Sequence, residues 1–426
     1  MALVSSSLIF RFLKVEEVGM WILFISMLGL LDSIRAGFVA TAFIRAYSGV
    51  SPARAAEVLG STWLIALVIT GLFISLNVLA LLLPLHVENQ SLNVFFHWFS
   101  ITFIVTMPTF LAGCVLQAEL KFDKLLYMRL ISGVLFIAGI IALILLKKLS
   151  LIGLLYLNIG RETITSLIAL ISGWTNMRMF RHRSMACAIE LSHFGKFSIG
   201  SFIGSMLLRY SDTFIINFML GPAPLAVYNV AQRFLEFIEI PLRSSIAIAI
   251  PEMSVAFNDN DKVRLGKMLQ KNAGLVTWVL LPIILLMLIF SDLLVYLLAG
   301  EKYMGTEAAN VLRIFLVIAI ISPIDRYFGV ALDVINMPKM NLYKVLIMLV
   351  ITILGDILGV KLTHNIYGVA IATAPTVISG FLFGYFIFNR YHQVSVLEIV
   401  ETGFNESKKF SASFLIKMLP TSSKIQ

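Results

Sequence analysis

The sequence has only two cysteines, Cys114 and Cys187, which are too few and too isolated to build a disulfide framework or a metal site. It also lacks a Gly-x-x-x-x-Gly-Lys-Ser/Thr loop for ATP, a His-Glu-x-x-His motif and the nucleophile, base and acid of a soluble hydrolase. We therefore expect no enzyme activity, no catalytic residue, no metal and no cofactor. Any transport would be coupled to another process, such as the movement of H⁺ or Na⁺.

Charged residues are scarce as well, at 13% of the chain, whereas hydrophobic residues make up 59%. Soluble domains have about 25% charged and about 45–50% apolar residues. Apolar runs long enough to cross a bilayer recur along nearly the whole chain. Backbone polar groups in lipid need partners within their own segment, and the period-two alternation of a barrel is absent. We therefore expect an all-α integral membrane protein.

The apolar runs predict about twelve transmembrane helices, the first of them truncated. Residues 2–10 are too short to span and end at Arg11. The full spans are predicted at 18–44, 58–85, 94–116, 125–146, 149–174, 194–220, 225–250, 275–298, 311–334, 342–362 and 366–388. Pro108 predicts a kink in one of these spans, and Pro241 predicts a kink in another.

The spans fall into two groups that have the pattern of repeats. The segment from Phe12 to Trp21 aligns without gaps on the segment from Met219 to Tyr228, and each enters a span. Parallel repeats predict two six-helix bundles related by a pseudo-two-fold axis along the membrane normal, with a ligand site at their interface. The expected domains are an N-terminal bundle at 1–175, a basic linker at 176–193, a C-terminal bundle at 194–388 and a tail at 389–426.

Basic residues set the predicted orientation. Alternate connections carry most of the lysines and arginines, including Arg45, Arg54, the linker arginines, Lys339 and Lys344. The positive-inside rule places these connections, the linker and the C-terminus in the cytoplasm. The net charge of +9 follows from this topology and predicts no nucleic-acid partner. The connections on the other side are too short for an external catalytic domain.

Four arginines lie near the middle of apolar runs, namely Arg35, Arg161, Arg209 and Arg233. An arginine at the centre of a span costs about 2.5–3.5 kcal/mol on insertion scales, so it normally faces a polar interior or an ion pair. These four residues are the predicted substrate-binding residues.

Acidic residues accompany the arginines at helical spacing. Asp32 with Arg35, Arg209 with Asp212, and Arg233 with Glu236 are each three residues apart, while Glu236, Glu239 and Arg243 continue one helical stripe. Arg161 adjoins Glu162, and Asp325 adjoins Arg326. Such pairs either neutralise each other for packing alone or line a charged cavity. If they line a cavity, Asp32, Asp212, Glu236 and Glu239 are candidates for ion coupling or charge pairing.

Several short segments resemble the polysaccharide flippases of the MOP superfamily, the Wzx-type transporters of O-antigen and other lipid-linked oligosaccharides. In the second half they are Phe194-Gly-Lys-Phe-Ser-Ile-Gly200, Leu220-Gly-Pro222, Ala226-Val-Tyr-Asn-Val-Ala231 and Ile250-Pro-Glu-Met-Ser254. In the first half, Val15 to Trp21 resembles the connection between the family's first two helices. The order and spacing of these segments carry the resemblance, which covers most of the chain.

The resemblance implies a transporter of the bacterial cytoplasmic (inner) membrane that alternates its access around a central cationic cavity. The implied substrate is an undecaprenyl-pyrophosphate-linked oligosaccharide, whose pyrophosphate suits guanidinium groups. Membrane lipids and other glycan-assembly proteins are the implied partners. Because members of this family begin with a complete first helix, the short helix here predicts a misassigned start codon or an impaired protein.

Three alternatives stay open at this point. A MATE-like, cation-coupled exporter of small molecules would favour acids and aromatics over arginines in its cavity. A membrane glycan polymerase or ligase would need a sizeable external loop. A non-transporting scaffold of a glycan-assembly complex would tolerate replacement of the arginines.

Overall fold

The computed structural model describes residues 1–83 and 89–418, and it is helical over nearly all of them. Residues 84–88, in a predicted connection, lie outside this description, as do the side chains of residue 2, of the 194–200 motif with Ser201, and of the tail from 410 onward. Contacts divide the chain into two compact units. Unit 1 comprises residues 1–227 and 298–302, and unit 2 comprises residues 228–297 and 303–426.

Polar side chains fix many of the helix starts. The hydroxyls of Ser51, Ser150 and Ser184 accept hydrogen bonds from backbone N–H groups three residues later, as N-cap residues do. Asparagines mark two of the helix ends, because Asn260 and Asn336 adopt left-handed backbone angles with φ of 55° and 60°. These local signals set the helix boundaries within the long apolar runs.

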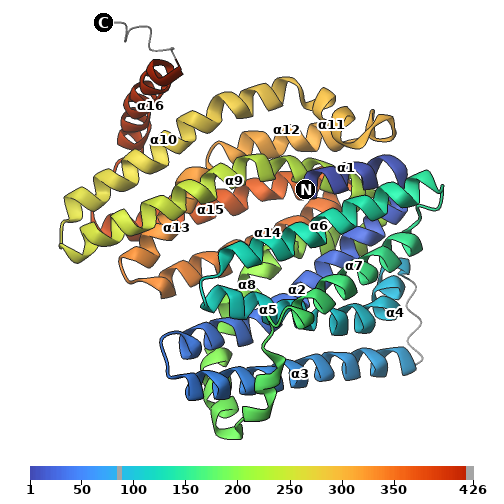
Figure 1. The fold of residues 1–426 in the computed structure, drawn as a ribbon. Coiled ribbons are helices and arrows are strands. Elements are labelled where there is room, and N and C mark those ends of the chain that lie inside the picture. The colour runs from blue at the N-terminus through green and yellow to red at the C-terminus, as the bar shows by residue number, and fades with distance from the viewer. Residues whose placement is uncertain (84–88, 419–426) are drawn as a thin grey trace, which may run out of the picture. The chain divides into compact units, whose positions relative to one another are not determined.

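Unit 1 contains α1 to α8. Their bounds are α1 Ala2–Phe12, α2 Val15–Tyr47, α3 Pro52–Leu82, α4 Gln90–Val105, α5 Met107–Ala118, α6 Phe122–Leu145, α7 Leu151–Ile171, the 3-10 helix η1 Met177–His182 and α8 Met185–Met219 (Figure 1). The first helix, α1, has 11 residues. It is tied to residues 298–302, because Ser7 donates to the Leu298 carbonyl (2.7 Å) and Lys302 donates to the Leu13 carbonyl (2.5 Å). Burial lowers the pKa of this lysine.

Helix α2 packs along α8 through glycines. A Cβ atom on Gly29 would lie 2.8 Å from the Tyr210 hydroxyl, and one on Gly37 would lie 2.9 Å from Cβ of Phe202. Small residues at a helix contact allow two helices to approach closely inside a membrane. Two long helices are therefore joined by shape rather than by polar bonds at these points.

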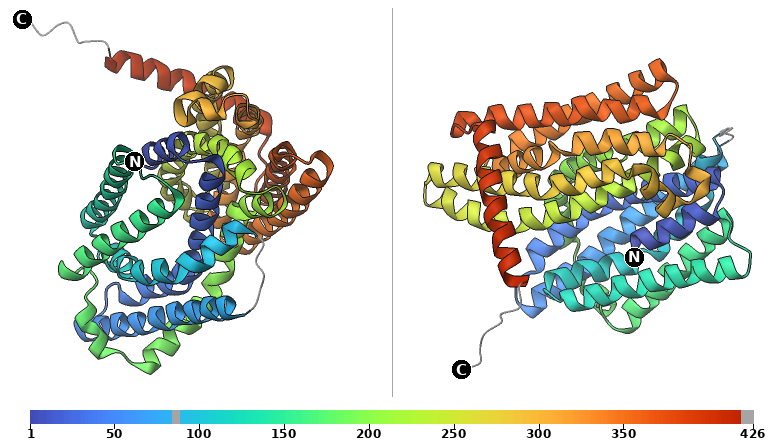
Figure 2. Two further views of the ribbon diagram at one scale, coloured as in Figure 1. Left: turned by 90° about the vertical axis from the view of Figure 1, so that its right-hand side faces the viewer. Right: turned by 90° about the horizontal axis from the view of Figure 1, so that it is seen from above.

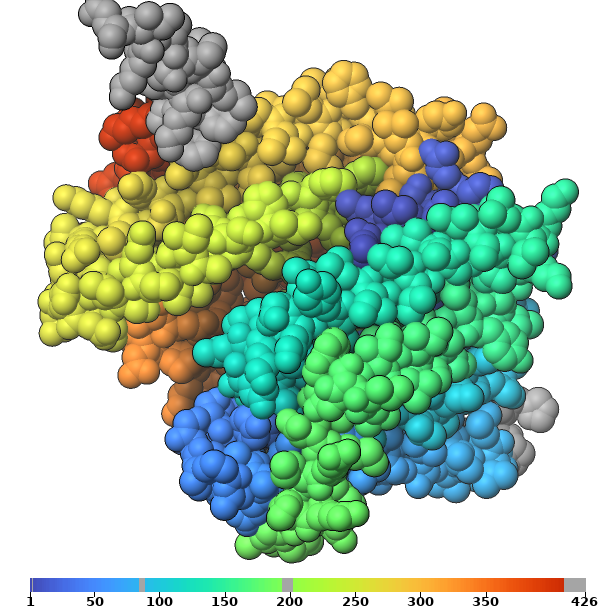
Figure 3. Space-filling model, viewed as in Figure 1, coloured from blue at the N-terminus to red at the C-terminus, as the bar shows by residue number. Residues whose placement is uncertain are grey.

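The predicted linker at 176–193 is largely helical. It consists of η1 and the first turns of α8, and it lies against the beginning of α3 (Figure 3). Ser61 donates to the Ser184 carbonyl and accepts from the Ser184 N–H, both at 3.0 Å, while Trp63 donates to the Thr175 carbonyl (3.1 Å). The segment is therefore bonded to unit 1 at both ends of η1.

Most of the remaining helices belong to unit 2. The long helix α9 Pro222–Asn258 begins in unit 1 and continues in unit 2. It is followed by α10 Lys262–Ile289, α11 Ser291–Ala299, η2 Glu301–Tyr303, α12 Ala308–Ala319, α13 Ser322–Val334, α14 Pro338–Thr363, α15 Ile366–Tyr391 and α16 Val396–Met418. The predicted kink at Pro241 does not interrupt α9, which stays one helix through that residue.

Helices α14 and α15 lie side by side at the closest distance that backbones allow. A Cβ atom on Gly359 would lie 2.4 Å from the Gly368 carbonyl oxygen, and Thr352 and Thr376 bond across the pair (2.9 Å). The two helices begin close to the predicted positions, at Pro338 and Ile366.

Helix α16 crosses α10 at a steep angle (Figure 2). At the crossing, a Cβ atom on Gly274 would lie 2.1 Å from the Ile399 carbonyl oxygen and 2.7 Å from Cα of Gly403. Trp278 donates to the Val400 carbonyl (2.9 Å) and its ring contacts that of Phe404 at a tilted angle, while Gln270 donates to Glu398 (2.6 Å). The predicted tail thus contains a helix that is docked within unit 2.

Among the described residues, seven helices are long and apolar enough to cross a membrane, and the number rises to nine if each of two bent pairs is one span. The bent pairs are α4 with α5, at 45°, and α12 with α13, at 49°. The first bend confirms the kink predicted at Pro108. Helices α8 and α9 are not among the nine, and both carry ionisable residues inside their apolar stretches. The chain is therefore an all-helical, multi-span membrane protein.

Candidate functional site

The pair of Asp32 and Arg35 forms as predicted, inside unit 1. Arg35 Nε donates to Asp32 Oδ1 (3.0 Å), and the arginine side chain is 1% exposed whereas the aspartate is 48% exposed. The rest of the guanidinium reaches the bend between α4 and α5, donating to the Phe103 carbonyl (3.5 Å) and to Thr106 Oγ1 (3.3 Å). It also lies over the rings of Phe103 and Phe110. Arg35 is therefore enclosed by its own unit.

Arg161 and Glu162 form a second charged pair in unit 1. Arg161 Nη2 lies 3.1 Å from Glu162 Oε1, and its guanidinium lies over the ring of Phe136. The Nε atom of Arg161 is buried and has no hydrogen-bond partner in the described part of the chain. Glu162 is close enough to Asp32 for their charges to interact. The predicted residues of α2 and α7 thus belong to one charged cluster.

Arg209, on α8, differs from the other three arginines because it is exposed. Its guanidinium lies near the ring of Tyr210, at 5.8 Å from the ring centre. The described residues include no carboxylate within ion-pair distance of it. An unpaired guanidinium keeps all of its N–H donors for an anion.

No ion pair between Arg209 and Asp212 is found in the described part of the chain, so their pairing stays a prediction. Asp212 accepts a hydrogen bond from the Ser211 hydroxyl (3.3 Å). A spacing of three residues places two side chains on the same side of a helix, but their rotamers decide whether they touch.

Helix α9 carries the charged stripe of unit 2. Arg233 Nη1 donates to Glu236 Oε1 (3.0 Å), with both side chains about a third exposed. Glu239 pairs with Arg243 on the same helix and with Arg326 of α13, whose Nη2 lies 3.9 Å away. Arg233 retains a buried Nε with no hydrogen-bond partner in the described part of the chain. Each predicted acid of this helix therefore has a basic partner.

The sequence did not indicate the most buried ion pair of unit 2. Lys344 Nζ lies 2.6 Å from Asp325 Oδ1 and donates to the Asp325 carbonyl (2.8 Å), with side chains 5% and 8% exposed. Lys344 was expected in a cytoplasmic connection, and Asp325 was expected to pair with Arg326. The predicted pairing of Asp325 with Arg326 is wrong, because Lys344 pairs with Asp325 and Arg326 pairs with Glu239. Lys344 lies buried within α14 rather than in a connection, and the side of the membrane on which it lies stays a prediction.

Metal ligation has no support among the described residues, where no group of three His, Cys, Asp or Glu side chains could hold an ion. The charged groups therefore offer hydrogen bonds and ion pairs rather than coordination. What they can bind is an anion, at guanidinium groups whose donors are incompletely used.

Residues 8–308, more than half of the chain, match the family described as polysaccharide biosynthesis protein. The chain belongs to the polysaccharide biosynthesis protein family. The similar proteins described as transporters and flippases agree with the predicted class, a transporter rather than an enzyme.

A curated relative of this polysaccharide biosynthesis protein is described as a probable low-salt glycan biosynthesis flippase, Agl15, of Haloferax volcanii. It is 23% identical over 380 residues, which cover 85% of this chain and 75% of the relative.

Two solved structures share the fold at a TM-score of 0.76. One is a multidrug resistance MATE family transporter of the MOP superfamily in an inward-facing conformation, at 14% identity, with 91% of this chain and 94% of that chain covered. The other is the lipid II flippase MurJ in an inward closed conformation, at 16% identity, with 99% of this chain and 91% of that chain covered. At these identities the likeness establishes the MOP fold of the polysaccharide biosynthesis protein, and the substrate has to be argued from its residues.

Proposed function

We propose that the protein is a flippase that moves an undecaprenyl-pyrophosphate-linked oligosaccharide across the bacterial inner membrane by alternating access through a cationic cavity. The linker and the C-terminus would face the cytoplasm. Family membership supports the class of transporter, and the curated relative supports a glycan as the cargo. The lipid carrier, the membrane and the orientation are part of the proposal.

The unpaired guanidinium of Arg209 is the observation that carries this proposal. An arginine without an ion-pair partner on a long membrane helix has a high energetic cost unless an anionic group binds to it. A pyrophosphate is such a counter-charge, and guanidinium groups bind phosphate oxygens through two parallel hydrogen bonds. A multidrug exporter of cationic compounds would gain nothing from this group.

The four predicted arginines are then proposed to act at different stages. Arg209 is available at once, while Arg161 and Arg233 each have a carboxylate neighbour that a pyrophosphate would have to displace. Arg35 is enclosed, so contact with a substrate would require its packing against the bend of α4 and α5 to open. We therefore rank Arg209 first, Arg233 and Arg161 next, and Arg35 last.

Coupling to H⁺ or Na⁺ is proposed to use Asp32. It is the half-exposed carboxylate of the unit 1 cluster, and its charge is balanced by the enclosed Arg35. Glu236 and Glu239 are engaged by arginines of unit 2, and Asp212 accepts from Ser211. Export by Asp32→Asn at varied external pH and Na⁺ tests this assignment. A response unchanged from the wild type would contradict it.

Replacement of Arg209 tests the flippase proposal directly. In cells that depend on this protein for surface glycan, we expect Arg209→Ala to lower export at least tenfold at normal protein level. Arg209→Lys should retain part of the activity, since lysine keeps the charge but not the planar fork. Arg129→Ala is the matched control, because Arg129 is an exposed arginine on another helix of the same unit.

The location of the accumulated substrate separates the rival functions. A flippase defect leaves lipid-linked oligosaccharide on the cytoplasmic side, whereas an exporter defect changes resistance to toxic compounds and leaves surface glycan intact. A scaffold would tolerate both Arg209→Ala and Arg233→Ala. Wild-type export in both variants would overturn the proposed site.

A further inference from the structure

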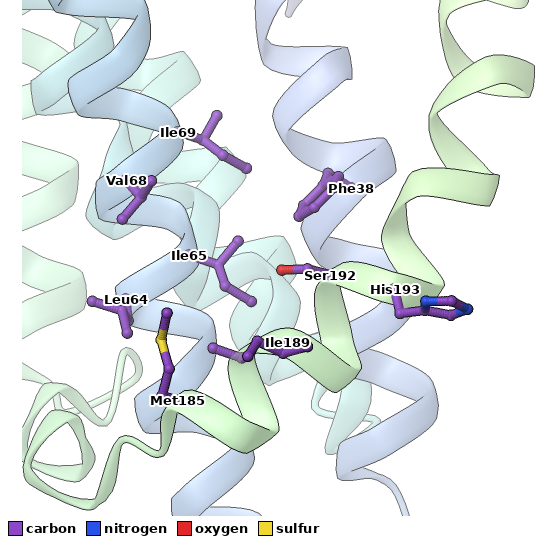
Figure 4. Close-up of a pocket in the computed structure, with 10 residues that line it drawn as sticks. Phe38, Leu64, Ile65, Val68, Ile69, Met185, Ile189, Ser192 and His193 are labelled. Carbon is purple, nitrogen blue, oxygen red and sulfur yellow. The ribbon is translucent and has the colours of Figure 1, made fainter.

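A cavity of about 480 Å³ lies between α2, α3 and the first turns of α8, entirely within unit 1 (Figure 4). Its walls are apolar and include Phe38 of α2, Leu64, Ile65 and Val68 of α3, and Met185 and Ile189 of α8. Ser192 and His193 supply its polar lining groups. A cavity of this size accommodates a ligand of several hundred daltons.

The cavity is continuous with an apolar surface of α3. Val68, in its wall, is followed at helical spacing by Leu72, Leu76 and Leu79, and all four side chains are more than half exposed. Because α3 is long and apolar enough to cross a membrane, we expect this exposed stripe to face the hydrocarbon of the bilayer. A hydrocarbon chain can therefore enter the cavity from the bilayer without crossing a polar region.

Exposed arginines lie in the segment that leads into the α8 wall of the cavity. Arg178, Arg181 and Arg183 of η1 and its end are exposed, and Arg183 stands two residues before the wall residue Met185. Arg54 is already neutralised by Glu57 and Glu190, so the arginines of the 177–183 segment supply the spare positive charge. Basic groups beside a membrane attract anionic headgroups by about 1 kcal/mol each.

The segment that carries these arginines is held in place. The paired hydrogen bonds of Ser61 with Ser184 fix the start of α8, and a Cβ atom on Gly60 would lie 2.5 Å from the Met179 carbonyl oxygen. The segment that carries the arginines is therefore bonded to α3, which forms one wall of the cavity. A site that is already assembled loses little free energy to ordering when it binds.

We propose that this cavity holds one acyl chain of an anionic phospholipid, whose phosphate is bound by Arg181 and Arg183. The volume suits a single acyl chain and not the far longer polyprenyl chain of a lipid-linked glycan. The site is therefore separate from the proposed transport path, and it would make the activity depend on the lipid composition of the cytoplasmic leaflet.

Lipid retention by the purified protein tests this site. Native mass spectrometry after exchange into mixed phosphatidylglycerol and phosphatidylcholine should detect one retained phosphatidylglycerol, at least fivefold over phosphatidylcholine. Ile189→Trp and Ser192→Phe, which fill the cavity from two positions, should each reduce retention at least tenfold. Leu72→Trp lies on the same stripe outside the cavity and should leave it unchanged.

A charge-matched pair of variants tests the headgroup contact. Arg181→Gln with Arg183→Gln should bring the two lipids to near parity, whereas Lys124→Gln with Arg129→Gln removes the same charge elsewhere in unit 1 and should keep the preference. Folding is checked by size-exclusion elution, and two cavity variants ensure that one poorly folded protein does not decide the result. Unchanged retention in both cavity variants would overturn the proposal. Displacement of phosphatidylglycerol by equimolar undecaprenyl phosphate would overturn it as well and assign the cavity to the substrate lipid.

Discussion

Each unit contains one bent helix pair, α4 with α5 in unit 1 and α12 with α13 in unit 2. The two bends differ in how charged side chains contact them. Each bend has a proline two residues after the break, at Pro108 and Pro323, so each loses a backbone donor. Backbone groups freed inside a membrane need protein partners. In both units a buried cation from another helix donates to a backbone carbonyl beside the bend, at Phe103 and at Asp325.

The cations differ in what balances their charge. Arg35 bonds the bend of unit 1, but its carboxylate partner Asp32 belongs to the same helix and is 48% exposed. Lys344 bonds the first turn of α13, and its partner Asp325 belongs to that turn and is 8% exposed. The bend of unit 1 thus leaves a charge accessible, whereas that of unit 2 is closed. A flippase that uses Asp32 for coupling would need the first arrangement.

Among the variants that test this difference between the units, Lys344→Met should lower the stability of the protein most. It leaves the Asp325 carboxylate buried without a counter-charge, which we expect to lower the free energy of unfolding by about 3–5 kcal/mol. Thermal unfolding in one detergent measures the loss. The double variant Lys344→Met with Asp325→Leu should recover most of it, since an apolar pair replaces the ion pair. A single variant as stable as the wild type would mean that water reaches the pair.

Arg35→Met should cost less, about 2 kcal/mol, because water can solvate the carboxylate that remains. The loss comes from the bonds to Phe103 and Thr106 and from the contacts with two aromatic rings. The same unfolding assay compares it with Lys344→Met. If Arg35→Met is the more harmful of the two, the proposed difference between the units is reversed.

Removal of neutral hydrogen bonds of a hydroxyl at each bend should cost about 1 kcal/mol per bond. In unit 1, Ser166→Ala removes the bond from its hydroxyl to the Val105 carbonyl (2.5 Å) and the bond between Ser166 and Thr109 (3.0 Å). In unit 2, Tyr327→Phe removes the bond between Tyr327 and Ser245 (2.7 Å). Ser166→Ala combined with Arg35→Met should deviate from additivity, because both residues hold the same bend. Strict additivity in unfolding would show that they act independently.

The smallest effect on stability is expected from the ion pair of Lys409 and Glu406 on α16. Hydrogen bonds from Lys409 and the nearby Lys271 lower the pKa of Glu406. A lowered acid pKa stabilises the docked helix at neutral pH, and this contribution is lost as the pH falls through the folded-state value. Limited proteolysis of α16 should therefore accelerate slightly in acid, and Glu406→Gln should abolish that dependence. Equal acceleration in both proteins would assign the effect to other groups.

The sequence predicted best the features that depend on residues of a single helix. Hydropathy predicted the all-helical membrane class, and the i,i+3 spacing predicted the pairs of Asp32 with Arg35 and of Arg233 with Glu236. Proline chemistry predicted the bend near Pro108. Each of these features depends on residues a few positions apart. The boundaries of the two predicted six-helix bundles, at 1–175 and 194–388, remain a prediction from the repeat pattern.

The sequence failed where partners come from different helices. Lys344 had the pattern of a loop lysine, yet its partner lies nineteen positions earlier, on the preceding helix. The cavity beside α3 depends on α8 returning to α3, and that return has no local signal in the sequence.

The glycine contacts between α2 and α8 bear on how the protein is made. Helix α8 carries Arg209 and Asp212 in its apolar stretch, so the insertion machinery would release it into lipid only reluctantly. Helix α2 is already synthesised when α8 leaves the ribosome. Tyr210 and Phe202 of α8 can then pack against Gly29 and Gly37 of α2. The earlier helix α2 thus provides the surface against which α8 packs during insertion. A bulky residue at Gly29 or Gly37 would first lower the amount of correctly inserted protein.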